Sequence, residues 1–168
     1  MNVKNNKRRR QSVEKIEKAF TNMLLTKELN EISVTDICKE TGLNRSTFYA
    51  NFLDVYDLAD KLKEKIERDF DAEFREKSSQ SALHMFQHIY ENQLFYKIYF
   101  KLGCDEKHQN FLYDTTRANM DFGGKHIAYH IEFFRNGLNA IIKLWLSGGC
   151  RETPEEMTEI LKSEYRGR

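Results

Sequence analysis

Polar side chains of the kinds that grip nucleic acid gather within seven consecutive positions, shortly after Gly42. An arginine can bind a guanine edge or a phosphate through two parallel hydrogen bonds, and hydroxyl or amide groups can donate to phosphate oxygens. Asn44 can cap a short helix that carries them all. The candidates for DNA contact on this helix are Arg45, Ser46, Thr47, Tyr49 and Asn51.

A second short helix must precede this one to hold it at a fixed angle. Ser33 followed three residues later by Asp36 has the pattern of a capping box, and Gly42 suits the left-handed turn that ends a helix. Two helices joined by a glycine turn follow the plan of a helix-turn-helix. The apolar residues that can form the small core between them are Val34, Ile37, Cys38, Leu43 and Phe48.

Two of the polar residues have an ordinary alternative role. Thr47 stands three residues after Asn44 and can serve only the cap of that helix. Arg45 can be a solvated surface arginine. The agreement of the spacing across the whole group favours the DNA-binding interpretation.

The run from Ser33 to Phe52 resembles the DNA-binding domain of the TetR/AcrR family of transcriptional regulators. It reads Ser-Val-Thr-Asp-Ile-Cys-Lys-Glu-Thr-Gly-Leu-Asn-Arg-Ser-Thr-Phe-Tyr-Ala-Asn-Phe, and Thr-Phe-Tyr-x-x-Phe is its most specific part. The resemblance covers roughly residues 8–60. The stretches 137–149 and 153–157 also resemble the C-terminal region of the branch that includes the dihydroxyacetone-kinase regulators.

The resemblance implies roles for individual residues. Arg45 and Ser46 would face base edges, and four residues would lie near phosphates: Thr35, Thr47, Tyr49 and Asn51. Relatives carry a lysine near the start of the fourth helix as a phosphate anchor, but no lysine occurs here until Lys61. Either the basic N-terminal arm compensates for this lysine, or the affinity for DNA is modest.

Apolar residues recur at helical spacing along most of the chain, and no segment has a convincing strand pattern. Helices are predicted over 12–29, 54–77, 105–119, 126–147 and 154–165, with two shorter ones over 80–102 that meet near Asn92. The fold class is all-α, TetR-like, with about nine helices. We expect a three-helix DNA-binding domain over 8–53 and a helical ligand-binding and dimerisation domain over 54–168.

The last two predicted helices carry more apolar residues than the end of a monomer needs. Two such helices from each subunit would form a four-helix interface between two copies. The alternative is that these residues close the chain's own core. The predicted dimer contacts are Leu138, Ile141, Ile142, Trp145, Met157, Ile160 and Leu161.

Aromatic residues concentrate in the centre of the chain. Some of them can line a cavity for a small-molecule effector, with hydroxyl groups to bind it, although any one of them can equally be ordinary core. The resemblance places the family's cavity among these central helices. The candidates are Tyr90, Tyr96, Tyr99, Tyr113 and Tyr129.

Two histidine pairs at a spacing of four have weaker claims as a metal site. His84 with His88, or His126 with His130, would need a third ligand such as Cys104 or His108. The alternative is that one histidine of each pair packs and the other is solvated. We therefore predict neither a metal nor a cofactor.

The remaining patterns narrow the class of protein. No nucleotide-binding loop, GxSxG or HExxH motif is present, so an enzyme is disfavoured. No apolar run approaches the ~18 residues of a membrane span, and three cysteines without a CxxC fit a cytoplasmic protein. The net charge is +1, yet residues 1–50 hold ten Lys/Arg against six Asp/Glu, which favours a polyanion partner.

Together these patterns predict a regulator, most simply a repressor, that binds double-stranded DNA as a homodimer and is released by a small-molecule effector. Two alternatives remain open. The chain could be a ligand-binding coactivator that acts through another regulator, which the missing lysine favours, or it could be a metal sensor.

Overall fold

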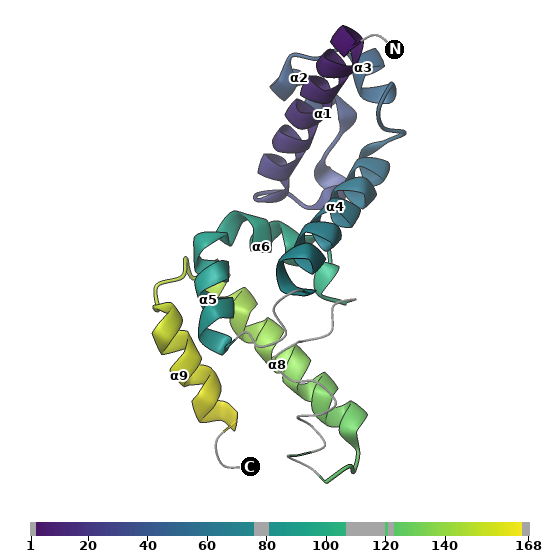
Figure 1. Cartoon of the computed structure of the whole chain (residues 1–168). Coiled ribbons are helices and arrows are strands. Elements are labelled where there is room, and N and C mark those ends of the chain that lie inside the picture. Colours follow the sequence, from purple (N-terminus) through teal and green to yellow (C-terminus); the bar gives the residue numbers. More distant parts are fainter. Residues whose placement is uncertain (1–2, 76–80, 107–119, 121–122, 166–168) are drawn as a thin grey trace. The chain divides into compact units, whose positions relative to one another are not determined.

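The computed structural model describes residues 3–75, 81–106, 120 and 123–165. Every regular element within these ranges is a helix, which confirms the predicted fold class (Figure 1). In chain order the elements are α1 (Val3–Leu24), η1 (Leu29–Glu31), α2 (Val34–Thr41), α3 (Arg45–Tyr49), α4 (Val55–Arg75), α5 (Ala82–Glu91), α6 (Gln93–Lys101), η2 (Cys104–Glu106), α8 (Ile127–Ser147) and α9 (Pro154–Tyr165), where η marks a 3-10 helix.

The chain divides into two compact units, Met1–Asp69 and Phe70–Arg168, each with its own buried core. In the first unit, α1 packs on α2 and α2 packs on α3. Phe20, Ile37, Phe48 and Leu58 are completely buried there. The predicted domain boundary at 53/54 falls just before α4, most of which belongs to the first unit.

Local side-chain chemistry sets the ends of α2. Ser33 and Asp36 form the predicted capping box, in which each backbone N–H donates to the other residue's side chain at 3.2 Å. Gly42 ends the helix with φ of +69°, a left-handed conformation that costs a residue with a Cβ roughly 1–2 kcal/mol. The sequence signals at both ends of this helix are therefore confirmed.

The N-terminal helix is longer at its start than the apolar pattern predicts. α1 begins at Val3 rather than near residue 12, and it ends at Leu24 instead of 29. Its added turns are rich in Lys and Arg, which are good helix formers without being apolar. A separate 3-10 turn follows, closed by a bond from the Glu28 N–H to the Glu31 carboxylate at 2.8 Å.

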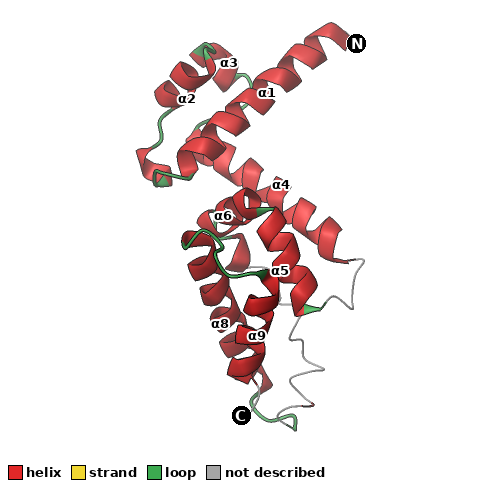
Figure 2. Ribbon diagram, turned by 90° about the vertical axis from the view of Figure 1, so that its left-hand side faces the viewer, coloured by secondary structure: helices red, strands yellow, loops and turns green. Residues whose placement is uncertain are grey.

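The second unit is built from α5, α6, α8 and α9, in which α5 packs on α9 and α6 packs on α8 (Figure 2). The Trp145 ring meets Phe86 edge-on at 5.6 Å and stacks on Tyr90 at 6.2 Å between centroids. The predicted junction of two helices near Asn92 is confirmed. The predicted helix over 105–119 lies almost entirely outside the described residues.

Helix signals near the C-terminus also match the structure. α8 starts one residue later than predicted and ends at Ser147, after which Gly149 adopts φ of +81°. The N–H of Thr153 donates to the Glu156 carboxylate at 2.7 Å, and the Glu156 N–H donates back to the Thr153 hydroxyl at 3.2 Å. This capping box starts α9 where the Thr-Pro-Glu-Glu motif predicts it.

The capping box of α2 predicts how stability responds to acid. Bonds from the Ser33 hydroxyl and then the Ser33 N–H lower the pKa of Asp36 below its usual 3.8. A carboxyl whose pKa is depressed by folding stabilises the protein above its unfolded pKa, and this stabilisation is lost as pH falls through the folded pKa. Thermal unfolding followed by circular dichroism should therefore show a smaller loss for Asp36→Asn than for the parent protein between about pH 5 and pH 3. Equal losses would contradict this contribution from Asp36.

Candidate nucleic-acid interface

The short helix α3 is anchored by one buried side chain. Phe48 is fully buried and packs against Phe52 with ring centroids 5.6 Å apart. With this face turned inward, Arg45, Ser46 and Tyr49 are exposed, and Tyr49 keeps 56% of its surface accessible. The structure therefore presents these three predicted DNA contacts to solvent.

Arg45 is held by the preceding helix. Its Nη2 donates to the Thr35 hydroxyl at 2.6 Å, which joins α3 to the first turn of α2. The partner is neutral, so the guanidinium is oriented while its charge stays available. Thr35, predicted as a phosphate contact, thus also holds the predicted base-reading arginine in place.

Asn51 lies just beyond α3 and makes contacts in three directions. Its Nδ2 donates to the Thr47 carbonyl at 2.8 Å, and its Oδ1 accepts from Arg9 Nε on α1 at 2.9 Å. Lys61 Nζ donates to its backbone carbonyl at 3.2 Å. Thr47 and Asn51 are both half-buried, so they are less accessible than Arg45.

The start of α4 is acidic where the family resemblance implies a lysine. Asp54 accepts from the Asp57 N–H at 2.8 Å, and Asp57 accepts from the Leu53 N–H at 2.9 Å. Lys61 binds the Asp57 carboxylate at 2.8 Å, and this bond is the largest cause that lowers the pKa of Asp57. Lys61 is thus neutralised by its own helix and makes a poor replacement for the missing phosphate anchor.

Two short helices, α2 and α3, are joined at a left-handed glycine and carry an exposed arginine, which is the geometry of a helix-turn-helix. Residues 76–164 match the family model for the C-terminal region of transcriptional regulators of TetR type. Because the match covers more than half of the chain, the protein belongs to the TetR family of transcriptional regulators. The predicted family is confirmed by a region that excludes the helix-turn-helix.

None of the curated proteins compared with the chain matches it. The branch of dihydroxyacetone-kinase regulators stays a prediction. Among the described helices, none combines the length and apolar content that crossing a bilayer requires.

The predicted pocket tyrosines do not share one environment. Tyr96 and Tyr99 are buried, and the Tyr96 hydroxyl lies 2.8 Å from His88 Nδ1. Tyr90 is 46% exposed and Tyr129 is 77% exposed. Tyr113 lies outside the described residues. Tyr96 and Tyr99 are therefore the two candidates that the structure brings together, with ring centroids 6.0 Å apart.

Most predicted dimer contacts are already covered by the chain itself. Five of the seven are buried within the second unit: Leu138, Ile142, Trp145, Met157 and Leu161. Ile160 is 40% exposed and Ile141 is partly exposed. The apolar residues of α8 that face solvent are others, chiefly Phe133 at 65% and Leu144 at 74% exposure.

The two histidine pairs that were considered as metal ligands do not assemble a metal site in the part of the chain that the structure describes. No three His, Cys, Asp or Glu side chains there lie close enough together to hold an ion. His108, one of the considered third ligands, lies outside that part.

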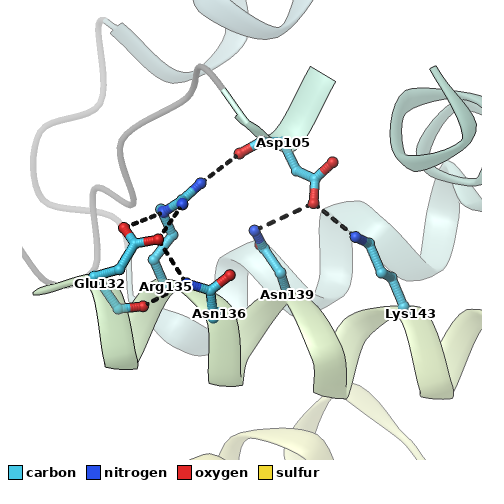
Figure 3. A network of polar contacts seen from close by, with 6 residues as sticks. All are labelled: Asp105, Glu132, Arg135, Asn136, Asn139 and Lys143. Carbon is cyan, nitrogen blue, oxygen red and sulfur yellow. Dashed lines mark hydrogen bonds and ion pairs between the residues drawn. The ribbon is translucent and has the colours of Figure 1, made fainter. Parts of the chain in front are cut away.

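A polar network between η2 and α8 was not apparent from the sequence (Figure 3). Asp105 is 9% exposed, and its carboxylate accepts from Lys143 Nζ at 2.7 Å and Asn139 Nδ2 at 3.5 Å. Arg135 donates to the Asp105 carbonyl at 3.1 Å and pairs with Glu132, whose pKa it lowers, together with Asn136. Asn139 and Lys143 stand one helical turn apart on α8, and this spacing of two polar residues is the sequence feature that could have predicted the network.

The network predicts that removing Lys143 alone destabilises the protein more than removing Lys143 together with the charge of Asp105. Lys143→Met leaves the buried Asp105 carboxylate without its charged partner, which should cost about 1–3 kcal/mol of unfolding free energy. Adding Asp105→Asn removes that charge and should restore part of the loss. Urea unfolding of the parent, Lys143→Met and the double variant measures both values. If the double variant is less stable than Lys143→Met, the unpaired charge of Asp105 is not the cause of the loss of stability in Lys143→Met.

Proposed function

We propose that this protein is a transcriptional repressor that binds a near-palindromic operator as a homodimer and is released by a small-molecule effector. Its membership of the TetR family supports regulation of transcription. The observation that carries the operator proposal is the arrangement of α3, where burial of Phe48 leaves Arg45, Ser46 and Tyr49 exposed on a helix-turn-helix. Binding to DNA would occur in the cytoplasm.

The proposed contacts divide by chemistry. Arg45 can bind a guanine edge through its fork, and Ser46 beside it can reach the neighbouring base. The exposed Tyr49 hydroxyl suits a phosphate, which carries no sequence information. One five-residue helix offers a small footprint, so two subunits reading two half-sites would supply the specificity.

The surface proposed to join the two copies is the outward face of α8. Phe133 and Leu144 share this face with Ala140 because they are spaced by seven and four residues, and all three are exposed. The small Ala140 between the two large residues allows close approach of a second helix. In a symmetric dimer the same face is used twice, which suits a self-complementary apolar stripe.

The proposed effector would act in the second unit. Tyr96 and Tyr99 offer buried rings and hydroxyl groups among its helices. An effector releases the protein from DNA only to the extent that it prefers the non-binding conformation. A screen for small molecules that raise the unfolding temperature of the purified protein would find candidates, because preferential binding stabilises the folded state.

The deciding experiment is a gel-shift with the DNA upstream of the protein's own gene and with duplexes selected from a random pool. A repressor of this type should bind specifically in both cases, and the DNA that it binds should contain an inverted repeat. Absence of sequence-specific binding would overturn the proposal and favour the alternative, a coactivator that uses this fold to bind another regulator.

Arg45 provides the first prediction for operator binding. Arg45→Ala should cost about 1–3 kcal/mol on the selected duplex and relax the preference at one base pair. Thr35→Val keeps the side-chain shape but removes the hydroxyl, so it should relax the same preference more weakly. Titrations of selected and random duplexes measure both effects. An equal loss on both duplexes would reassign Arg45 to the phosphate backbone.

The α8 face provides the second prediction. Phe133→Glu with Leu144→Glu should weaken dimerisation by about 3 kcal/mol or more, since each charge enters a symmetric apolar interface twice. Leu94→Glu, at a half-exposed position on α6, is the matched control. Sedimentation equilibrium measures the assembly and a gel-shift the operator affinity. A double variant that stays dimeric would show that the interface lies elsewhere. A monomeric variant with full affinity for the operator would contradict the model in which two subunits read two half-sites.

A further inference from the structure

Arg9 and Asn51 join the basic N-terminal helix to the end of the recognition helix, although 42 positions separate them in the chain. Arg9 is exposed and Asn51 is half-buried. A second bond orients the Asn51 amide, because its Nδ2 donates to the Thr47 carbonyl at 2.8 Å. Its Oδ1 is thereby directed at Arg9 Nε, 2.9 Å away.

This contact orients the arginine without neutralising it. Within the part of the chain that the structure describes, Arg9 forms no ion pair with a carboxylate. The two acidic residues of α1 are taken by other cations, since Glu14 pairs with Arg10 at 3.1 Å and Glu17 with Lys65 at 2.8 Å. The charge of Arg9 therefore remains available at the edge of the recognition helix.

The atoms that remain on Arg9 suit a phosphate. Nε is used by Asn51, which leaves the two terminal nitrogens with four N–H groups. Such a planar pair of donors binds two phosphate oxygens at once. The Lys61 ammonium, by contrast, is already bound to the Asp57 carboxylate and the Asn51 carbonyl.

We propose that Arg9 is the phosphate anchor of the DNA-binding surface, and that Asn51 is a positioning residue that aims it. This assignment rests on the proposed function. It gives the role of the missing lysine on α4 to one arginine on α1, which reaches the DNA beside α3. It also changes the role of Asn51 from direct phosphate contact to orientation of the group that makes the contact.

The test measures affinity for a random-sequence duplex and for the selected operator duplex between about 50 and 200 mM salt. Arg9→Gln should reduce the salt slope by about 0.9 and weaken binding about eightfold at 0.1 M salt, because one phosphate contact is lost. The loss should be the same on both duplexes, since phosphates carry no sequence information. Arg10→Gln, on the same helix but paired with Glu14, is the matched control and should change neither value.

The role of Asn51 is tested by combining variants. Asn51→Ala should weaken binding in the parent protein but have little further effect once Arg9→Gln is present, because it acts through Arg9. Additive losses would show a direct contact from Asn51 and overturn its positioning role. Arg9→Lys should keep most of the slope, and melting curves verify that each variant is folded.

The failure of this inference is distinct from the failure of the proposed function. If the parent protein binds DNA with a normal salt slope and Arg9→Gln leaves it unchanged, the assignment of Arg9 is wrong while the function stands. If the parent protein has no specific operator, the proposed function itself fails.

Discussion

The helix-turn-helix of this protein depends on the burial of one phenylalanine. A helix of five residues cannot hold its own backbone in water, because helix nucleation costs more than so few hydrogen bonds return. The burial of Phe48, whose ring packs against Phe52, supplies the stability that this short helix lacks by itself. The direction in which Arg45 projects and the position at which Asn51 meets α1 both follow from that anchor.

Four cations of the first unit are held by partners of two kinds. Arg45 and Arg9 are oriented by a hydroxyl and an amide, which leave their charges intact. Lys61 and Lys65 are instead bound by carboxylates. Because neutral partners leave the positive charges of Arg45 and Arg9 uncompensated, these two side chains are consistent with the binding of a polyanion.

Signals confined to a few neighbouring residues were predictable from the sequence, whereas contacts between distant residues were not. The capping pair of Ser33 with Asp36 and the left-handed Gly42 act within one turn, so their residue types reveal them. Periodicity placed Leu138 and Trp145 on one apolar face of a helix, but it cannot tell whether a second copy or the chain's own helices bury that face. The contact of Arg9 with Asn51 depends on how α1 packs, which no local pattern encodes.

The proposed effector and the proposed partner subunit would both act on α8, because α6, which carries Tyr96 and Tyr99, packs on this helix. One face carries the buried core residues, the next binds Asp105 through Asn139 and Lys143, and a third presents Phe133 and Leu144 to solvent. Because a helix moves as a rigid rod, a shift that weakens the Asp105 contacts also displaces the outward face. Coupling between the two sites would then need no separate pathway, only two positions of α8 that a ligand and a partner subunit favour to different extents.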